Sequence, residues 1–312
     1  MATKVVAAAF GGPEVLSVVE AEAPQPGPGE VVIAVKAAAI NPIDYKIIAG
    51  GPGADPDRLP LPVGLEVAGV VTAAGPDAAG PAGPIEVGDE VVAYPVQGGY
   101  ADTVTAQAKV AVPKPPGLDW PVASSVLLVG GTAAHTLQVA AAKPGETLLV
   151  HGAAGSVGQI AAQLAVQDGA RVIGTAGESN HERLRGYGVI PVTYGPGLAD
   201  RVRELAPDGV DAAIDTIGTD EAIDVSLELV ADRSRIVSIA AFGRADTGIV
   251  LISGDDPETN VRADAWRRLL PAAADGSLKV AVARTYPLGE AAEAVRFVRD
   301  GHAGGKVVLL PS

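Results

Sequence analysis

The residues with the clearest chemical potential form a turn of small residues between two apolar stretches. Residues 148–151 have the character of a buried strand, residues 152–158 are rich in glycine and alanine, and residues 159–165 have helical spacing. A strand, tight turn and helix in this order let the main chain approach a pyrophosphate, whose charge is met by N–H groups and the positive helix end. We therefore predict that this turn binds a dinucleotide. The residues expected to make these contacts are Gly152, Ala154, Gly155, Val157 and Gly158.

The turn departs from the usual pattern of such sites. The fingerprint G-x-G-x-x-G has Ala153 at its first glycine position, while Gly155 and Gly158 occupy the other two. A glycine-rich turn that closes an ordinary strand–helix unit is therefore an alternative interpretation of this segment alone.

A second apolar segment, residues 171–175, ends where dinucleotide enzymes select their cofactor. A carboxylate there binds the ribose 2′-hydroxyl of NAD and repels the 2′-phosphate of NADP, and Thr175 is not a carboxylate. We therefore expect NADP, although Glu178 and Glu182 would repel a phosphate if they turned inward. The nearby candidates for phosphate binding are Ser179, Asn180, His181 and Arg183. A solvated helix face is the alternative interpretation of Arg183.

Composition limits the class of protein. With 312 residues, 48% of them hydrophobic and 19% charged, the chain is globular and long enough for about two domains. The formal net charge of −14 argues against nucleic acid or an anionic membrane as the main partner. The chain has no cysteine, and its four histidines do not pair at ligand spacing, so we predict no metal site. No membrane span or signal peptide is evident, and we expect a cytoplasmic protein.

The elements that must position the turn change in character along the chain. Residues 1–118 read as short strands punctuated by glycine and proline, which indicates a β domain. Residues 119–279 begin with alanine-rich helices and then alternate strands with helices, which predicts a doubly wound parallel sheet. Residues from about 280 to 312 resemble the first segment, so we expect them to complete the β domain. The ligand crevice should lie at the carboxyl ends of the parallel strands, where the turn after residue 216 adds Ile217.

Some local expectations are more detailed. We predict a loop at residues 75–84, helices at residues 121–129 and 133–142, and one helix at residues 261–274. The substrate pocket is expected to include the loops at residues 50–62 and 255–260.

Seven landmarks follow one another through nearly the whole chain: Asn41-Pro42-x-Asp44, Pro62-x-Gly64-x-Glu66-x-Ala68-Gly69-Val70-Val71, Val87-Gly88-Asp89-Glu90-Val91, Gly98-Gly99-Tyr100-Ala101, Gly131-Thr132-Ala133, His151-Gly152-Ala153-Ala154-Gly155 and Gly305-Lys306-Val307-Val308. In this order they resemble the medium-chain dehydrogenase/reductase superfamily, in its zinc-independent quinone oxidoreductase, or zeta-crystallin, branch. The resemblance implies an α/β protein with a GroES-like β domain and a Rossmann domain. It also implies NADPH-dependent reduction of quinones or of the C=C bond of α,β-unsaturated carbonyls.

One difference from the wider superfamily supports a metal-free reaction. Zinc-dependent alcohol dehydrogenases carry Gly-His-Glu where this chain has Gly64-Leu65-Glu66, and leucine cannot bind zinc. Simple alcohol oxidation is therefore disfavoured. A conjugated acceptor takes hydride at carbon and spreads charge onto oxygen, so hydrogen-bond donors can replace a metal.

The same resemblance suggests roles for further residues. Asn41 and Thr132 match positions beside the nicotinamide, and Tyr194 matches a tyrosine near the 2′-phosphate. Tyr45 and Lys46 are candidate proton donors alongside water, although Lys46 reads equally well as a surface lysine. The residues expected against the nicotinamide half are Ile239, Ala240 and Phe242. We expect Glu66 to be a buried, paired carboxylate and Lys306 to close a strand.

Two other interpretations remain at this point. A Rossmann methyltransferase would need a different glycine turn and an acid after the second strand, which disfavours it. An NADPH-binding structural or regulatory protein with little turnover would keep the same cofactor residues. The resemblance also suggests a homodimer that pairs through an edge strand at residues 249–253.

Overall fold

A computed structural model describes residues 1–51, 54–253, 260–301 and 303–311, which divide into two compact units. Unit 1 comprises Met1–Leu128 and Trp266–Ser312, and unit 2 comprises Val129–Ala265. The two ends of the chain therefore build one unit, and the middle of the chain builds the other.

Unit 1 is mainly β-structure. Its strands are β1 (Ala2–Ala7), β2 (Leu16–Ala21), β3 (Glu30–Ile40), β4 (Leu61–Pro62), β5 (Val67–Ala74), β6 (Ala79–Gly80), β7 (Gly83–Pro84), β8 (Glu90–Ala93), β9 (Thr103–Gln107), β10 (Ala111–Pro113), β17 (Val282–Pro287) and β18 (Lys306–Leu310). Its helices are α1 (Pro42–Ala49), α2 (Trp120–Ala123), α9 (Trp266–Asp275) and α10 (Ala291–Arg299). The helix α3 (Leu127–Ala140) begins here and continues into unit 2.

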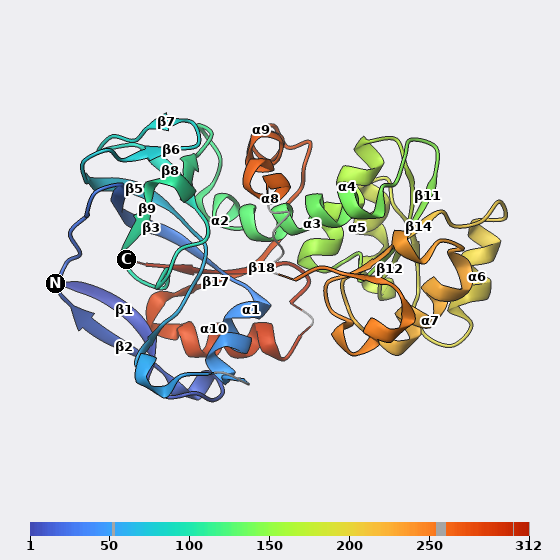
Figure 1. The fold of residues 1–312 in the computed structure, drawn as a ribbon, viewed down its shortest axis with the longest axis horizontal. Coiled ribbons are helices and arrows are strands. Elements are labelled where there is room, and N and C mark those ends of the chain that lie inside the picture. Colours follow the sequence, from blue (N-terminus) through green and yellow to red (C-terminus); the bar gives the residue numbers. More distant parts are fainter. Residues whose placement is uncertain (52–53, 254–259, 302, 312) are drawn as a thin grey trace. The chain divides into compact units, whose positions relative to one another are not determined.

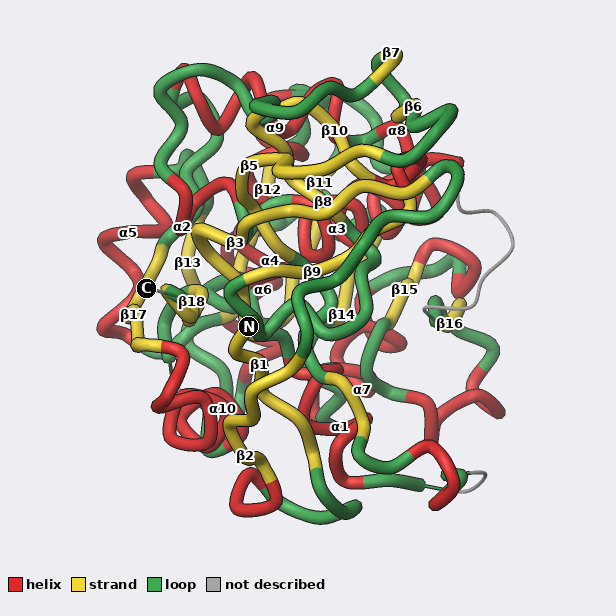
Figure 2. Tube along the Cα trace, turned by 90° about the vertical axis from the view of Figure 1, so that its left-hand side faces the viewer, coloured by secondary structure: helices red, strands yellow, loops and turns green. Residues whose placement is uncertain are grey.

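The main sheet of unit 1 has β3 near its centre. The strand order is β10-β8-β5-β3-β18-β17, and β9 also pairs with β3. These strands are labelled in Figure 2. Because β18 is antiparallel to β3, the last strand of the chain lies beside the segment that leads into Asn41.

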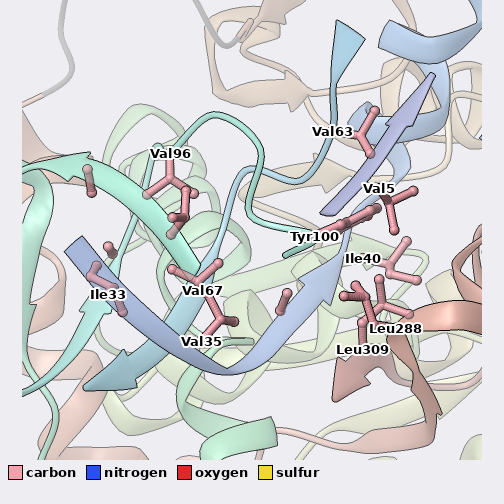
Figure 3. Packing of buried hydrophobic residues seen from close by; sticks show 14 of the residues in the cluster. Val5, Ile33, Val35, Ile40, Val63, Val67, Val96, Tyr100, Leu288 and Leu309 are labelled. Atoms are coloured by element: carbon pink, nitrogen blue, oxygen red, sulfur yellow. The ribbon is translucent and has the colours of Figure 1, made fainter. Parts of the chain in front are cut away.

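Burial explains why β3 is apolar almost throughout. Ile33, Val35 and Ile40 belong to the large core cluster of unit 1, part of which is seen in Figure 3. Ala37 and Ala39 instead pack with Val308 in a second, small cluster. A strand covered on both faces needs apolar side chains at consecutive positions, as residues 31–35 and 37–40 provide on either side of the exposed Lys36.

Unit 2 contains an open sheet, seen with its surrounding helices in Figure 1. Its strands are all parallel. The strands are β11 (Thr147–His151), β12 (Arg171–Thr175), β13 (Ile190–Val192), β14 (Ala212–Asp215), β15 (Ile236–Ser238) and β16 (Val250–Leu251), in the order β13-β12-β11-β14-β15-β16. The helices are the rest of α3, α4 (Ser156–Gln167), α5 (His181–Gly186), α6 (Leu198–Leu205), α7 (Asp220–Leu229) and α8 (Asn260–Asp264).

Both faces of this sheet are covered by helices. Leu148 and Val150 pack in a cluster that includes residues of α3, α4 and α5. Leu149, between them in sequence, packs in a second cluster with residues of α6 and α7. Alternate residues of one strand thus enter two cores, as in a doubly wound fold. The predicted α/β fold class is confirmed.

Several local expectations need correction. The predicted loop at residues 75–84 contains the short hairpin of β6 and β7. The predicted helix at residues 121–129 is interrupted after Ala123, because the hydroxyls of Ser124 and Ser125 both donate to the carbonyl of Pro121, at 3.2 and 2.7 Å. The helix expected at residues 261–274 is divided into α8 and α9. Within the described residues, no helix has the length and apolar character required to cross a bilayer.

Candidate functional site

The glycine turn of unit 2 is packed directly against the first turn of α4. Gly152 has φ +72°, a left-handed conformation that favours glycine. A Cβ atom added at Gly158 would lie 2.2 Å from the carbonyl oxygen of Gly152. These two glycines are therefore required by backbone conformation and by close approach of the chain.

The alanine at the first fingerprint position also has a structural explanation. Ala153 is completely buried, and its Cβ lies 2.6 Å from where a Cβ at Gly174 would be. The missing side chain of Gly174 thus provides the room that Ala153 occupies.

Thr175 supports the turn from the end of β12. Its buried Oγ1 accepts a hydrogen bond from the N–H of Gly152 at 3.1 Å, and its carbonyl accepts one from the N–H of Ala153 at 3.0 Å. The residue proposed to select the cofactor therefore also fixes the turn.

The start of α4 can bind an anion. Gly155 is the N-cap and has no side chain to accept from the first-turn N–H groups, which include those of Val157 and Gly158. These donors and the positive end of a 12-residue helix favour a phosphate group. The turn therefore fits a pyrophosphate.

Arg183 lies beside this turn. Its guanidinium donates to the carbonyl of Ala154 at 3.2 Å and to Oδ1 of Asn180 at 2.8 Å. The carboxylate-bearing neighbours Glu178 and Glu182 are exposed, whereas Arg183 is half-buried. A cation is thus held at the edge of the turn by neutral oxygen atoms.

Other predicted phosphate ligands lie around the end of β12. The Nε2–H of His181 donates to the carbonyl of Ala176 at 3.2 Å. The hydroxyl of Tyr194 lies 3.8 Å from the Cβ position of Gly177, and the side chain is 56% exposed. Ser179 is exposed in the short helix before α5.

The remaining cofactor candidates follow β14 and β15 or lie on α3. Ile217 is 57% exposed and Phe242 is 51% exposed, so both apolar side chains are accessible at this edge of the sheet. Ile239 and Ala240 are half-buried in the segment after β15, and Thr132 is half-buried on α3. The carboxyl ends of neighbouring strands thus carry an uncovered apolar surface.

Two buried residues missed by the sequence analysis organise these segments. Asp215 ends β14 and Ser238 ends β15, and the Ser238 hydroxyl donates to the Asp215 carboxylate at 2.6 Å. A charged residue that ends an apolar strand was the available signal for Asp215. His151 is buried beside them, and burial lowers its pKa to about 4, so it is neutral at pH 7.

The candidate catalytic residue Asn41 lies in unit 1, in a buried polar network. The Lys306 Nζ donates to Oδ1 of Asn41 at 2.6 Å and lies 4.0 Å from Oε2 of Glu66. Glu66 also accepts a hydrogen bond from the N–H of Leu128 at 3.0 Å. Burial raises the pKa of Glu66 and lowers the pKa of Lys306, because each charged form loses water.

Asp44 belongs to the same network. Its Oδ2 accepts hydrogen bonds from the N–H of Asn41 and the hydroxyl of Tyr100, both at 2.7 Å. Burial raises the pKa of Asp44 to about 6, although these donors and the positive charge of Lys306 oppose the shift. Sequence reasoning did not single out Tyr100, whose partner is 56 residues away.

A cavity of about 420 Å³ opens in unit 1 next to α1. Asp44 and Lys46 contribute to its wall, and Lys46 is exposed. Tyr45 packs half-buried against the hydrophobic core of unit 1. The apolar part of the wall includes Phe10, Ile47, Leu61, Val63 and Leu65.

The loops expected around the substrate are partly described. Of residues 50–62, Gly50, Gly51, Ala54, Asp55 and Arg58 contribute to the cavity wall, and residues 52–53 lie outside the described residues. Residues 255–259 of the second loop also lie outside them.

A doubly wound parallel sheet whose first strand is followed by a glycine-rich, phosphate-binding turn is typical of dinucleotide-binding enzymes. Family profiles agree: residues 27–143 match the alcohol dehydrogenase GroES-like domain, and residues 191–309 match the zinc-binding dehydrogenase family. The quinone oxidoreductase of Pseudomonas aeruginosa is 32% identical, with 100% of both chains covered. The chain therefore belongs to the medium-chain dehydrogenase/reductase superfamily, in its zinc-independent quinone oxidoreductase branch, as predicted.

Two further comparisons show the range of relatives. The structure of the Escherichia coli quinone oxidoreductase complexed with NADPH has a TM-score of 0.86 and 28% identity, covering 99% of this chain and 100% of that one. A mycocerosic acid synthase-like polyketide synthase from Mycolicibacterium smegmatis is 31% identical over 96% of this chain. The chain corresponds to only 15% of that synthase. Similar sequences therefore occur both as separate proteins and within long synthases.

Proposed function

We propose that this protein is an NADPH-dependent oxidoreductase that reduces quinones or the C=C bond of α,β-unsaturated carbonyl compounds without a metal. The observation that carries the proposal is the phosphate-binding turn with Arg183 beside it, in a chain of the quinone oxidoreductase branch. The similar Escherichia coli enzyme, whose structure was determined with NADPH, supports this cofactor.

The residues of unit 2 fit NADPH in three places. The N–H groups of Val157 and Gly158 would bind the pyrophosphate, whereas the N–H of Gly155 donates to the carbonyl of Gly152 at 2.9 Å and closes the turn. Arg183, with Asn180, His181, Ser179 and Tyr194 nearby, would bind the 2′-phosphate, since a guanidinium suits phosphate geometry. The exposed apolar residues after β14 and β15 would cover the nicotinamide half. When bound, NADPH supplies the hydride.

The cavity of unit 1 is our candidate for the acceptor site. Its volume is within the usual range for small-molecule sites, and its wall is largely apolar, as a quinone or enone ring requires. Lys46 offers a positive charge to an oxygen on which negative charge develops. Because Lys46 contributes to the cavity wall while Tyr45 packs against the core, we favour Lys46 or water as the proton source over Tyr45.

The roles of the two domains and the oligomeric state are part of the same proposal. We assign acceptor binding to a substrate domain of residues 1–118 and about 280–312, and cofactor binding to residues 119–279. We also propose a cytoplasmic homodimer formed through β16, which ends the strand order of its sheet. Light scattering on the purified protein at several concentrations tests the dimer.

The activity is tested by titrating the protein with NADPH and with NADH, and then following nicotinamide absorbance after addition of 1,4-naphthoquinone or cyclohex-2-enone with EDTA present. We expect EDTA-insensitive oxidation with preference for NADPH. Tight NADPH binding without oxidation of either acceptor would favour the regulatory alternative. Failure to bind either nucleotide would contradict the assignment of the glycine turn.

A further inference from the structure

The segments after β14 and β15 are joined by a buried carboxylate that makes several hydrogen bonds. Oδ1 of Asp215 accepts from the N–H groups of Ile217 and Gly218, each at 3.0 Å, and Oδ2 accepts from the N–H of Gly218 at 3.1 Å. Asp215 is completely buried. The backbone just after β14 is therefore held by the side chain that ends the strand.

Ser238 extends this arrangement to the next strand. Its hydroxyl donates to Oδ2 of Asp215 at 2.6 Å and accepts from the N–H groups of Ala240 and Ala241, at 3.1 and 2.9 Å. One hydroxyl thus connects the backbone after β15 to the carboxylate at the end of β14. Ser238 is also completely buried.

The two segments are in close contact at their backbones. Gly218 has φ +79°, and a Cβ atom there would lie 2.9 Å from the carbonyl carbon, carbonyl oxygen and Cβ of Ala240. Directly beside these contacts, Ile217 and Phe242 remain about half exposed. A buried, hydrogen-bonded base therefore presents two apolar side chains that the folded chain leaves about half exposed.

Sheet topology indicates which part of a dinucleotide this surface meets. The pyrophosphate-binding turn follows β11, and the residue that selects at the ribose ends β12, on one side of β11. β14 and β15 lie on the other side of β11. The segments that follow them are thus on the side opposite the adenosine half.

We propose that Asp215 and Ser238 are positioning residues that hold both segments in the conformation that receives the nicotinamide half of the cofactor. The proposal rests on the proposed function, since it requires NADPH binding. Neither side chain touches the cofactor in this mechanism. Both act by reducing the conformational freedom that the segments would otherwise lose on binding.

The test measures Kd for NADPH and for adenosine 2′,5′-bisphosphate, which lacks the nicotinamide half. Ser238→Ala leaves the N–H groups of Ala240 and Ala241 without this acceptor and removes one of the hydrogen-bond donors to the Asp215 carboxylate. We expect its Kd for NADPH to rise about tenfold while its Kd for the bisphosphate changes less than about twofold. Asp215→Asn should show the same selectivity with a larger effect, because one amide group cannot accept from donors on both sides.

Ser226→Ala is the matched control. Ser226 is another completely buried serine of unit 2, and its hydroxyl donates to the carbonyl of Ala222 at 2.8 Å and lies 3.1 Å from Nε2 of His151. We expect this variant to leave both Kd values unchanged. Kd values are measured below the melting temperature of each variant. The test with Ser238→Ala does not depend on Asp215→Asn, so it remains valid even if Asp215→Asn does not fold.

Each outcome is informative. If Ser238→Ala raised Kd for both ligands by the same factor, the proposal would be overturned. The same holds if Ser226→Ala raised Kd for NADPH as much as Ser238→Ala does. Either result would indicate general loosening of unit 2. The proposal would also be overturned if the wild-type protein bound NADPH no more tightly than it binds the bisphosphate. Wild-type protein that binds neither ligand would instead contradict the proposed function.

Discussion

The buried ammonium of Lys306 leads to a prediction about the stability of unit 1. This side chain is almost fully buried, donates to Asn41 and lies 4.0 Å from Oε2 of Glu66. Replacing Lys306 with methionine preserves much of the apolar volume but removes the positive charge. Glu66 would then be a buried carboxylate whose Oε2 has lost its nearest cation.

The magnitude follows from the separation of the two groups. Unit charges 4 Å apart attract by about 4 kcal/mol at an effective dielectric constant of about 20. Breaking one member of a buried ion pair costs about 3–5 kcal/mol, because the remaining charge has no compensation. We therefore expect Lys306→Met to lower the unfolding free energy of unit 1 by about 3–5 kcal/mol. Adding Glu66→Gln should restore most of that loss, since it removes the stranded charge.

Intrinsic fluorescence can isolate this unit. The chain has two tryptophans, Trp120 and Trp266, and both belong to unit 1. Urea unfolding followed by tryptophan emission therefore reports on the unit that contains the network. A loss below about 1 kcal/mol in Lys306→Met would refute the reasoning, and so would a double variant as unstable as the sum of the two single variants.

Three further predictions concern the turn, the acid in the cavity wall and the cofactor phosphate. Gly158→Ala forces a Cβ to 2.2 Å from a backbone carbonyl, so we expect NADPH affinity to fall at least about tenfold in a fluorescence titration; Gly186→Ala, with no atom within 4 Å, should leave it unchanged. The pKa of Asp44 rises from 3.8 to about 6 on folding, so the folded state binds a proton at this carboxyl more tightly than the unfolded state does. Proton binding at Asp44 therefore stabilises the folded state at low pH, and this stabilisation is lost as pH rises from about 4 to about 6. In urea unfolding, wild type should therefore lose stability relative to Asp44→Asn across that window, and parallel pH curves would contradict the assignment. Arg183→Ala should raise Kd for NADPH at least about fivefold and leave Kd for NADH nearly unchanged, whereas the exposed Arg185→Ala should alter neither; equal effects on both nucleotides would argue against a 2′-phosphate role.

The architecture of unit 2 was predictable because its signals are local. Alternating apolar strands and amphipathic helices of ordinary length dictate a parallel sheet with helices on both faces. The turn at residues 152–158 was found because close backbone approach restricts side-chain size at single positions. The reason for Ala153 was not predictable, since the space it fills is provided by Gly174 on another strand.

Helix boundaries were less predictable because they depended on single hydrogen bonds. Residues 121–129 have the composition of one helix, yet the hydroxyls of Ser124 and Ser125 bind the carbonyl of Pro121 at the point where α2 ends. Serine can form such bonds in helical and non-helical backbone alike, so its presence alone does not determine where a helix ends.

The partners of the buried charges could not be predicted either. Glu66 was expected to be paired inside the β domain. Its partner is Lys306, which is 240 positions further along the chain and could not be identified from the sequence. Only the pairing of β18 with β3 brings that lysine beside Asn41. Such a contact depends on the completed sheet, and a single sequence contains no local pattern that specifies it.

The Asn-Pro-x-Asp segment has a folding role beside its proposed functional one. Asn41 is the N-cap of α1, Pro42 is its first residue, and the Asp44 carboxylate accepts the N–H of Asn41. This spacing satisfies the requirements of a helix start. The side-chain oxygen of Asn41 is bound by Lys306, and its Nδ2 lies 3.4 Å from the carbonyl of Ala39, so the amide is already used within unit 1. We therefore propose that the segment contributes to function indirectly, by fixing the start of the helix that carries Lys46 to the cavity wall.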